Sequence, residues 1–175
     1  MKNKLFPTLA LGIICLVVVL VLAAVNTITA PLIEKAQAEK VQKALAEVMP
    51  EGVNFTEIEV DGLPAAVTKV YSEDGGGYVF QMSVVGYKPG LVILCGIDVS
   101  GVITGADFVS SNETLSAEVG LGKNFIGHTS DTVTVELVAG STAKKTTSAY
   151  YSAIEAALEA FEIISQNSEG QEDTK

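Results

Sequence analysis

The chain is 175 residues long and acidic, with a formal net charge of −10 at pH 7. Phosphodiester backbones repel such a chain, so nucleic acid is not an expected partner. One histidine (His128) and two cysteines (Cys15 and Cys95) are too few for a catalytic triad, a histidine-based metal site or an iron–sulfur cluster.

The N-terminal segment, residues 1–33, is predicted to anchor the protein in a membrane. Residues 5–33 carry no charge, and about 20 apolar helical residues cross a hydrocarbon core of ~30 Å. A cleaved signal peptide is the alternative, but the apolar run 9–25 is longer than the ~7 to 15 residues usual for such a peptide. Lys2 and Lys4 place the N-terminus in the cytoplasm and the rest of the chain on the extracytoplasmic side.

The next segment, residues 34–50, predicts a juxtamembrane helix. Before Pro50 its sequence, EKAQAEKVQKALAEVM, alternates charged residues with alanine, valine and leucine at helical spacing. One side of this helix is apolar and can dock on the following domain or on a neighbouring subunit. That side consists of Ala36, Val41, Ala44, Leu45 and Val48.

From residue 51 the pattern changes to short strands separated by turns, which predicts an α+β domain over residues 51–164. The strands are expected to form an antiparallel sheet of roughly five or six strands, covered on one face by a C-terminal helix. The expected strands span 53–60, 66–71, 78–85, 91–99, 102–109 and 131–138. The last segment, 165–175, is polar and is predicted to be disordered.

The C-terminal helix follows a segment rich in hydroxyl groups. Apolar residues recur at helical spacing from Tyr150 to Ile164. Before them, hydroxyls and two lysines accompany the unpaired amides of a helix N-terminus, which favours binding of a phosphate. Helix capping by Thr146, Thr147 or Ser148 is the alternative, and both roles can coexist. The segment comprises Gly140, Ser141, Thr142, Lys144, Lys145, Thr146, Thr147 and Ser148.

This segment resembles the flavin-attachment motif of the FMN-binding domain family. The residues that carry the resemblance are Glu136, Ala139, Gly140, Ser141 and Thr142, followed by Thr146, Thr147, Ala149 and Tyr150. The family includes the G subunit of the Rnf electron-transport complex and the C subunit of the sodium-translocating NADH:quinone reductase. The resemblance implies that Thr142 carries FMN through a phosphoester bond. A gap-free alignment would put Lys144 at that position instead, and a noncovalent site is a further alternative.

Earlier parts of the chain are similar to other blocks of the same family, at residues 86–90, 92–97, 101–105, 112–114 and 119–122. A flavin ring is flat and mostly apolar, and its redox potential depends on hydrogen bonds and on access of water. Glycines let backbone amides approach such a ring, a leucine packs on its face, polar side chains bond its edges, and a tyrosine stacks on it. The residues expected in these roles are Tyr87, Glu113, Thr114, Gly120, Leu121 and Gly122.

These features predict an electron carrier without a substrate of its own. By resemblance, it is the G-like subunit of an Rnf-type ferredoxin:NAD oxidoreductase that translocates sodium ions or protons. A flavin transferase would attach FMN, and membrane subunits with flavin or iron–sulfur centres would be its partners. Two alternatives stay open: a membrane-anchored binding or assembly module without covalent flavin, and an extracellular flavin reductase that acts alone.

Overall fold

The computed structural model describes residues 5–114 and 116–172, without the side chains of residues 5–10, 28, 31–38 and 168–172. The chain divides into two compact units, residues 1–40 and residues 41–175. Helix α1 (Leu5–Val48) begins in the first unit and ends in the second. The second unit therefore includes residues 41–50, which the sequence pattern assigns to the juxtamembrane helix.

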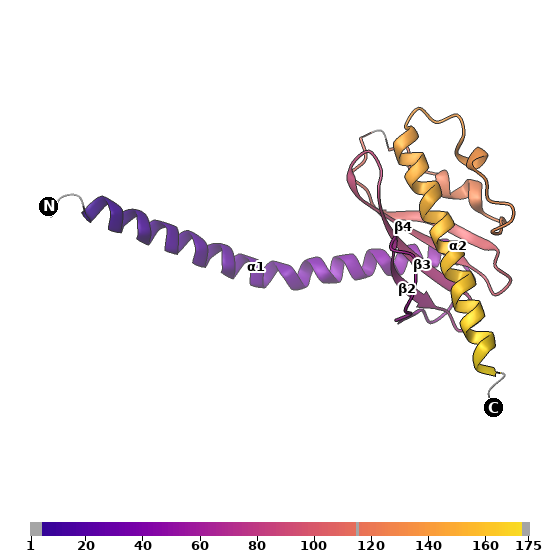
Figure 1. The fold of residues 1–175 in the computed structure, drawn as a ribbon. Coiled ribbons are helices and arrows are strands. Elements are labelled where there is room, and N and C mark those ends of the chain that lie inside the picture. The colour runs from indigo at the N-terminus through magenta and orange to yellow at the C-terminus, as the bar shows by residue number, and fades with distance from the viewer. Residues whose placement is uncertain (1–4, 115, 173–175) are drawn as a thin grey trace. The chain divides into compact units, whose positions relative to one another are not determined.

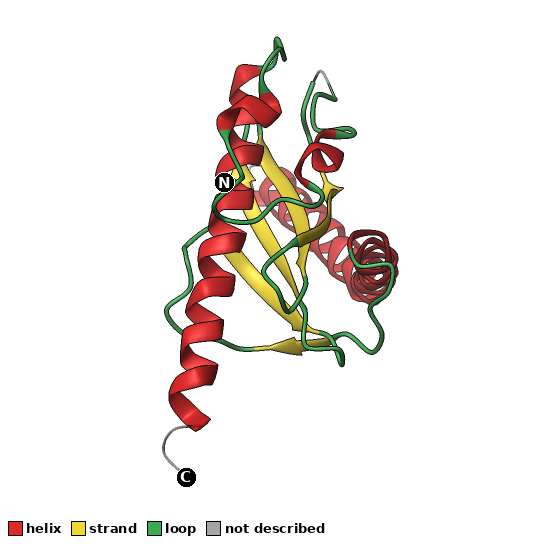
Figure 2. Cartoon of the chain, turned by 90° about the vertical axis from the view of Figure 1, so that its right-hand side faces the viewer, coloured by secondary structure: helices red, strands yellow, loops and turns green. Residues whose placement is uncertain are grey.

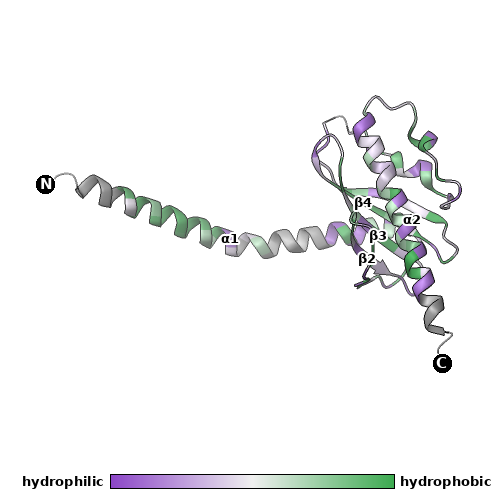
Figure 3. Ribbon diagram, viewed as in Figure 1, coloured by the Kyte–Doolittle hydropathy of each residue, from purple (hydrophilic) through white to green (hydrophobic). Residues whose placement is uncertain are grey.

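In the first unit, α1 presents an apolar surface. All side chains from residue 11 to residue 27 are exposed, and Figure 3 shows hydrophobic residues along this part of the helix. The hydroxyls of Thr27 and Thr29 donate to the carbonyl oxygens of Ala23 and Val25 over 2.9 and 2.7 Å, so they are bonded within the helix. No helix in the described part of the chain is both long and apolar enough to cross a membrane.

The second unit is built on a five-stranded antiparallel sheet in which each strand pairs with the next in sequence, in the order β1-β2-β3-β4-β5. This confirms the predicted α+β class and antiparallel sheet. The centre of the sheet carries the longest apolar runs, and β3 begins and ends where the sequence predicts. The strands are β1 (Thr56–Ile58), β2 (Val67–Ser72), β3 (Tyr78–Val85), β4 (Pro89–Ile97) and β5 (Ile103–Ser110).

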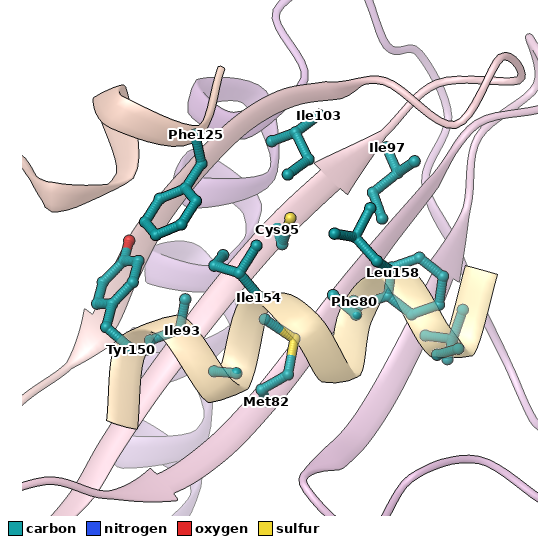
Figure 4. Close-up of a cluster of buried hydrophobic side chains, with 14 of the residues drawn as sticks. Phe80, Met82, Ile93, Cys95, Ile97, Ile103, Phe125, Tyr150, Ile154 and Leu158 are labelled. Carbon is teal, nitrogen blue, oxygen red and sulfur yellow. The ribbon is translucent and has the colours of Figure 1, made fainter. Parts of the chain in front are cut away.

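Helix α2 (Lys144–Glu172) covers one face of this sheet, running across β3 and β4 (Figures 1 and 2). Successive side chains of a strand point to opposite faces, and α2 packs on the face that carries Phe80, Ile93 and Cys95. Figure 4 shows these side chains against Ile154 of the helix. α2 is longer at both ends than the sequence pattern indicates, and its helical backbone includes residues 165–172, which were predicted to be disordered.

The end of α1 covers the other face of the sheet. Leu45 and Val48 are buried against Val79 and Leu94, in a second apolar cluster. The last turn lies very close to the sheet, because a methyl group on Gly105 would be 2.6 Å from the Val48 carbonyl oxygen. The apolar side predicted for this helix is thus docked on the domain at residues 41–48, while Ala36 lies outside the described side chains.

The sixth predicted strand, 131–138, does not form. Its residues make turns and the short 3-10 helix η3 (Val135–Val138), which buries Val138 in the main core. At the start of β5, the backbone of Ile103 is bonded instead to the amide of Gly127 and the carbonyl of His128, over 2.8 and 2.9 Å. Because these bonds occupy the edge of β5 at Ile103, residues 131–138 have no partner strand there. Their alternating sequence forms turns and a 3-10 helix instead.

Candidate functional site

The site is built around the first turn of α2. Gly140 has a φ of +88°, a left-handed conformation that glycine adopts without strain, and it redirects the chain into the helix. The Ser141 hydroxyl accepts a hydrogen bond from the Ala143 amide over 3.2 Å. α2 begins at Lys144, so the predicted capping residues Thr146, Thr147 and Ser148 lie inside the helix. Ser141 bonds the backbone at the start of the helix instead, and the Thr142 side chain is left exposed.

Glu113 connects this turn to two other segments. Its carboxylate accepts hydrogen bonds from the backbone amides of Tyr87 and Lys88 over 3.2 and 3.1 Å, and another from the hydroxyl of Thr146. A methyl group on Gly86 would lie 2.5 Å from a Glu113 carboxylate oxygen, so a larger residue there would displace the carboxylate. The loop before β4, the segment after β5 and the start of α2 are therefore held together by one side chain.

These bonds keep Glu113 ionised. Partial burial is the largest single influence and acts to raise its pKa, because a charge loses hydration there. The hydrogen bonds from Thr146, Lys88 and Tyr87, with the positive charge of Lys88, together outweigh burial and hold the pKa below the usual value for a glutamate. Thr146 is only 2% exposed, so its hydroxyl is committed to this contact.

A cavity of about 520 Å³ lies between these segments, within the range typical of small-molecule sites. Most of the side chains predicted to bind a ligand face it, although they come from three separate parts of the sequence. Its lining residues are Tyr87, Glu113, Thr114, Thr142, Ala143, Lys144, Lys145 and Thr146. Sequence reasoning missed only Ala143 in this set, because alanine carries no chemical signal.

A second hollow, of about 540 Å³, adjoins the first at the two lysines that line both. The α2 residues in its wall recur every three or four positions, as two adjacent pairs and a single residue, so they share one face of the helix. That helical spacing is the signal in the sequence that indicates this wall. The wall consists of Val85, Gly86, Lys144, Lys145, Ser148, Ala149 and Ser152.

The predicted glycine loop does not line the cavity. Gly122 is buried against β5, where a methyl group would lie 1.6 Å from the carbonyl oxygen of Ala106. Gly120 has a φ of +79° and starts the 3-10 helix η2 (Leu121–Phe125), and Leu121 packs against the main core. Gly122 therefore allows η2 to pack closely on the sheet.

The remaining predicted residues support the turn. Gly140 and Ser141 shape the chain before α2, and Thr147 is buried with its hydroxyl bonded to the carbonyl oxygens of Ala143 and Lys144 over 3.3 and 3.2 Å. Glu136, from the motif, lies exposed in η3. Within the described residues, no group of three or more acidic, histidine or cysteine side chains is placed to hold a metal ion.

No protein-family model matches the chain, and no curated protein matches it significantly. The chemistry of the cavity is therefore the basis for assigning a function.

Proposed function

We propose that the protein is an electron-carrier subunit that holds FMN in this cavity, esterified to Thr142, within a membrane-bound ion-translocating ferredoxin:NAD oxidoreductase of the Rnf type. The observation that carries the proposal is the lining of the cavity. An exposed threonine hydroxyl, two lysines, an aromatic ring and a carboxylate converge there from three segments. The resemblance of the segment 136–150 to a flavin-attachment motif indicates that the ligand is FMN.

The anionic end of FMN fits the wall formed by the start of α2. Lys144 and Lys145 are exposed cations beside Thr142, and the first amides of a helix have no partners within the helix. Both features stabilise a phosphate attached to the Thr142 hydroxyl. Esterification needs an accessible hydroxyl. The Thr142 side chain is exposed, whereas the hydroxyls of Thr146 and Thr147 are buried and bonded.

Other lining residues suit a flat ring. The Tyr87 side chain is 65% exposed at the rim of the cavity, where its ring can stack on another aromatic surface. Thr114 offers an exposed hydroxyl, and Glu113 offers a fixed hydrogen-bond acceptor. FMN supplies reversible uptake of one or two electrons when bound, and the chain itself supplies position, charge and partial exclusion of water.

The membrane anchor is proposed on sequence. The uncharged run 5–33 extends on both sides of the described side chains 11–27, and it exceeds the about 20 residues that a crossing requires. Lys2 and Lys4 at its start would keep the N-terminus in the cytoplasm and the flavin domain outside. Membrane subunits with their own redox centres are the proposed electron donors and acceptors.

The decisive experiment is an intact-mass measurement of the full chain after co-expression with a flavin transferase. We expect a gain of about 440 Da, the mass of an FMN ester after loss of water, in the wild type and in the control Thr114→Val. The control removes an exposed cavity hydroxyl without touching the attachment site. We expect no gain in Thr142→Val. Equal gains in all three chains would refute Thr142 as the attachment site.

One observation favours a second candidate, a membrane-anchored binding or assembly module without covalent flavin. The glycine loop 120–122, expected at a flavin ring, packs on β5 instead. This candidate predicts no mass gain in any chain and no flavin fluorescence in the supernatant after denaturation. Fluorescence without a mass gain would indicate noncovalent FMN.

A further inference from the structure

The carboxylate of Glu113 occupies a position that is built for an anion. Two consecutive backbone amides, those of Tyr87 and Lys88, and the hydroxyl of Thr146 all donate to it. Such convergent donors bind free anions in many proteins. Here the chain fills the position with its own side chain, so the donors are not available to a phosphate from a ligand.

We propose that the Glu113 carboxylate lowers the reduction potential of a flavin bound in this cavity. The proposal rests on the proposed function. Of the residues described as lining the cavity, Glu113 is the only acid. The three donors hold its carboxylate in one place, so its charge acts at a fixed point in the wall.

Glu113 lies close to the expected position of the ligand. Its carboxylate accepts a hydrogen bond from Thr146 in the first turn of α2, four residues after Thr142. It also lines the same cavity as Thr142, Lys144 and Lys145. A flavin held in this cavity through Thr142 therefore lies near a fixed negative charge.

The effect on potential follows from the sign of the charge. Each electron added to a flavin brings negative charge to the ring, and a carboxylate nearby disfavours that addition. Glu113 therefore favours the oxidised flavin. A single fixed charge in a partly buried wall changes the equilibrium constant for one-electron reduction on the order of tenfold, which equals about 59 mV for a one-electron couple.

The test is a potentiometric titration of the full flavinylated chain in detergent, for the wild type and three variants. Two electrons pass to the bound flavin from each dithionite ion, which is oxidised to two sulfite ions. Glu113→Gln removes the charge and keeps the size of the side chain, and Glu113→Asp keeps the charge. Glu159→Gln removes one charge from an exposed position on α2, about 20 Å farther along the helix than Thr146.

We expect Glu113→Gln to raise the reduction potential by about 59 mV, which corresponds to a tenfold change in the equilibrium constant. We expect Glu113→Asp and Glu159→Gln to have potentials near that of the wild type. Loss of a mere structural contact would lower the melting temperature in both Glu113 variants without this charge-specific shift. A flavinylated, folded Glu113→Gln chain with the wild-type potential would overturn this inference and leave the proposed function unaffected. No mass gain in the wild type would instead overturn the proposed function and the inference with it.

A second measurement covers the case in which Glu113→Gln does not fold or takes up no flavin. Its sample is wild-type chain labelled with ¹³C-glutamate, studied by infrared difference spectroscopy between its oxidised and reduced states. We expect a carboxylate stretching band that shifts with the label, because the ring gains charge near Glu113. A difference spectrum without a label-sensitive carboxylate band would overturn the inference.

Discussion

The docked end of α1 gives the sharpest test of the fold. Leu45 is fully buried, and it packs with Val48 of the same helix against Val79 and Leu94 of the sheet. Leu45→Ala removes most of that side chain. The surrounding wall cannot collapse easily, because the adjacent helix end lies against the glycine backbone of the sheet at Gly105. We therefore expect a loss of about 3 to 4 kcal/mol in the free energy of unfolding, within the range of buried leucine truncations.

Tyrosine fluorescence during urea unfolding of the full chain in detergent measures this loss. The chain has five tyrosines and no tryptophan, and every tyrosine lies after residue 70, so the signal reports on the second unit alone. The matched control is Val53→Ala, at a side chain that is 57% exposed, for which we expect a change within about 0.5 kcal/mol. If Leu45→Ala changed the stability no more than this control, the end of α1 would not belong to the core.

Three further predictions use the same unfolding assay. Gly122→Ala forces a methyl group to within 1.6 Å of the Ala106 carbonyl oxygen, so we expect the free energy of unfolding to fall by about 3 kcal/mol or more. Gly120→Ala is the control, because Gly120 lies in open space with a φ of +79°, and it should cost only about 1 to 2 kcal/mol. Equal losses in the two variants would contradict the packing of η2. Thr104→Val removes a hydroxyl that donates to the last carbonyl of α1 over 2.7 Å, which should cost about 1 to 2 kcal/mol; an unchanged midpoint would show that this bond contributes nothing. The folded-state pKa of Glu113 is lowered, so its contribution to stability is present above the ordinary glutamate pKa of about 4.3 and is lost as the pH falls through the folded value. The difference in stability between the wild type and Glu113→Gln should therefore shrink below about pH 4. A constant difference from pH 7 to pH 3 would refute this prediction.

The sequence predicted elements best where one physical pattern acted alone. The strand Tyr78–Val85 was predicted with its correct bounds, because its β-branched and aromatic residues begin directly after a glycine-rich turn. The segment 131–138 has an alternating pattern but is not a strand. Alternation indicates a preference for extended backbone, yet a strand also needs a partner, and the edge of β5 is bonded elsewhere at Ile103.

The candidate site was predicted in part for the same reason. Local chemistry identified Thr142 and the two lysines, because hydroxyls and cations before a helix have a recognisable role in anion binding. The role of Glu113 could not be derived, since its partners Tyr87 and Thr146 are 26 and 33 residues away in sequence. The glycines at 120 and 122 were read as contacts for a ligand, whereas Gly122 is required by a backbone contact within the fold.

By itself, the sequence determined the fold class, the central strands and the hydroxyl- and lysine-rich start of α2, because hydrophobic period and local residue chemistry act over a few neighbours. Only the tertiary structure decided which segments meet at the cavity, that the end of α1 belongs to the core, and that the glycine loop supports η2. These outcomes depend on contacts between residues far apart in the chain, where close approach of backbones and satisfaction of hydrogen bonds decide the arrangement.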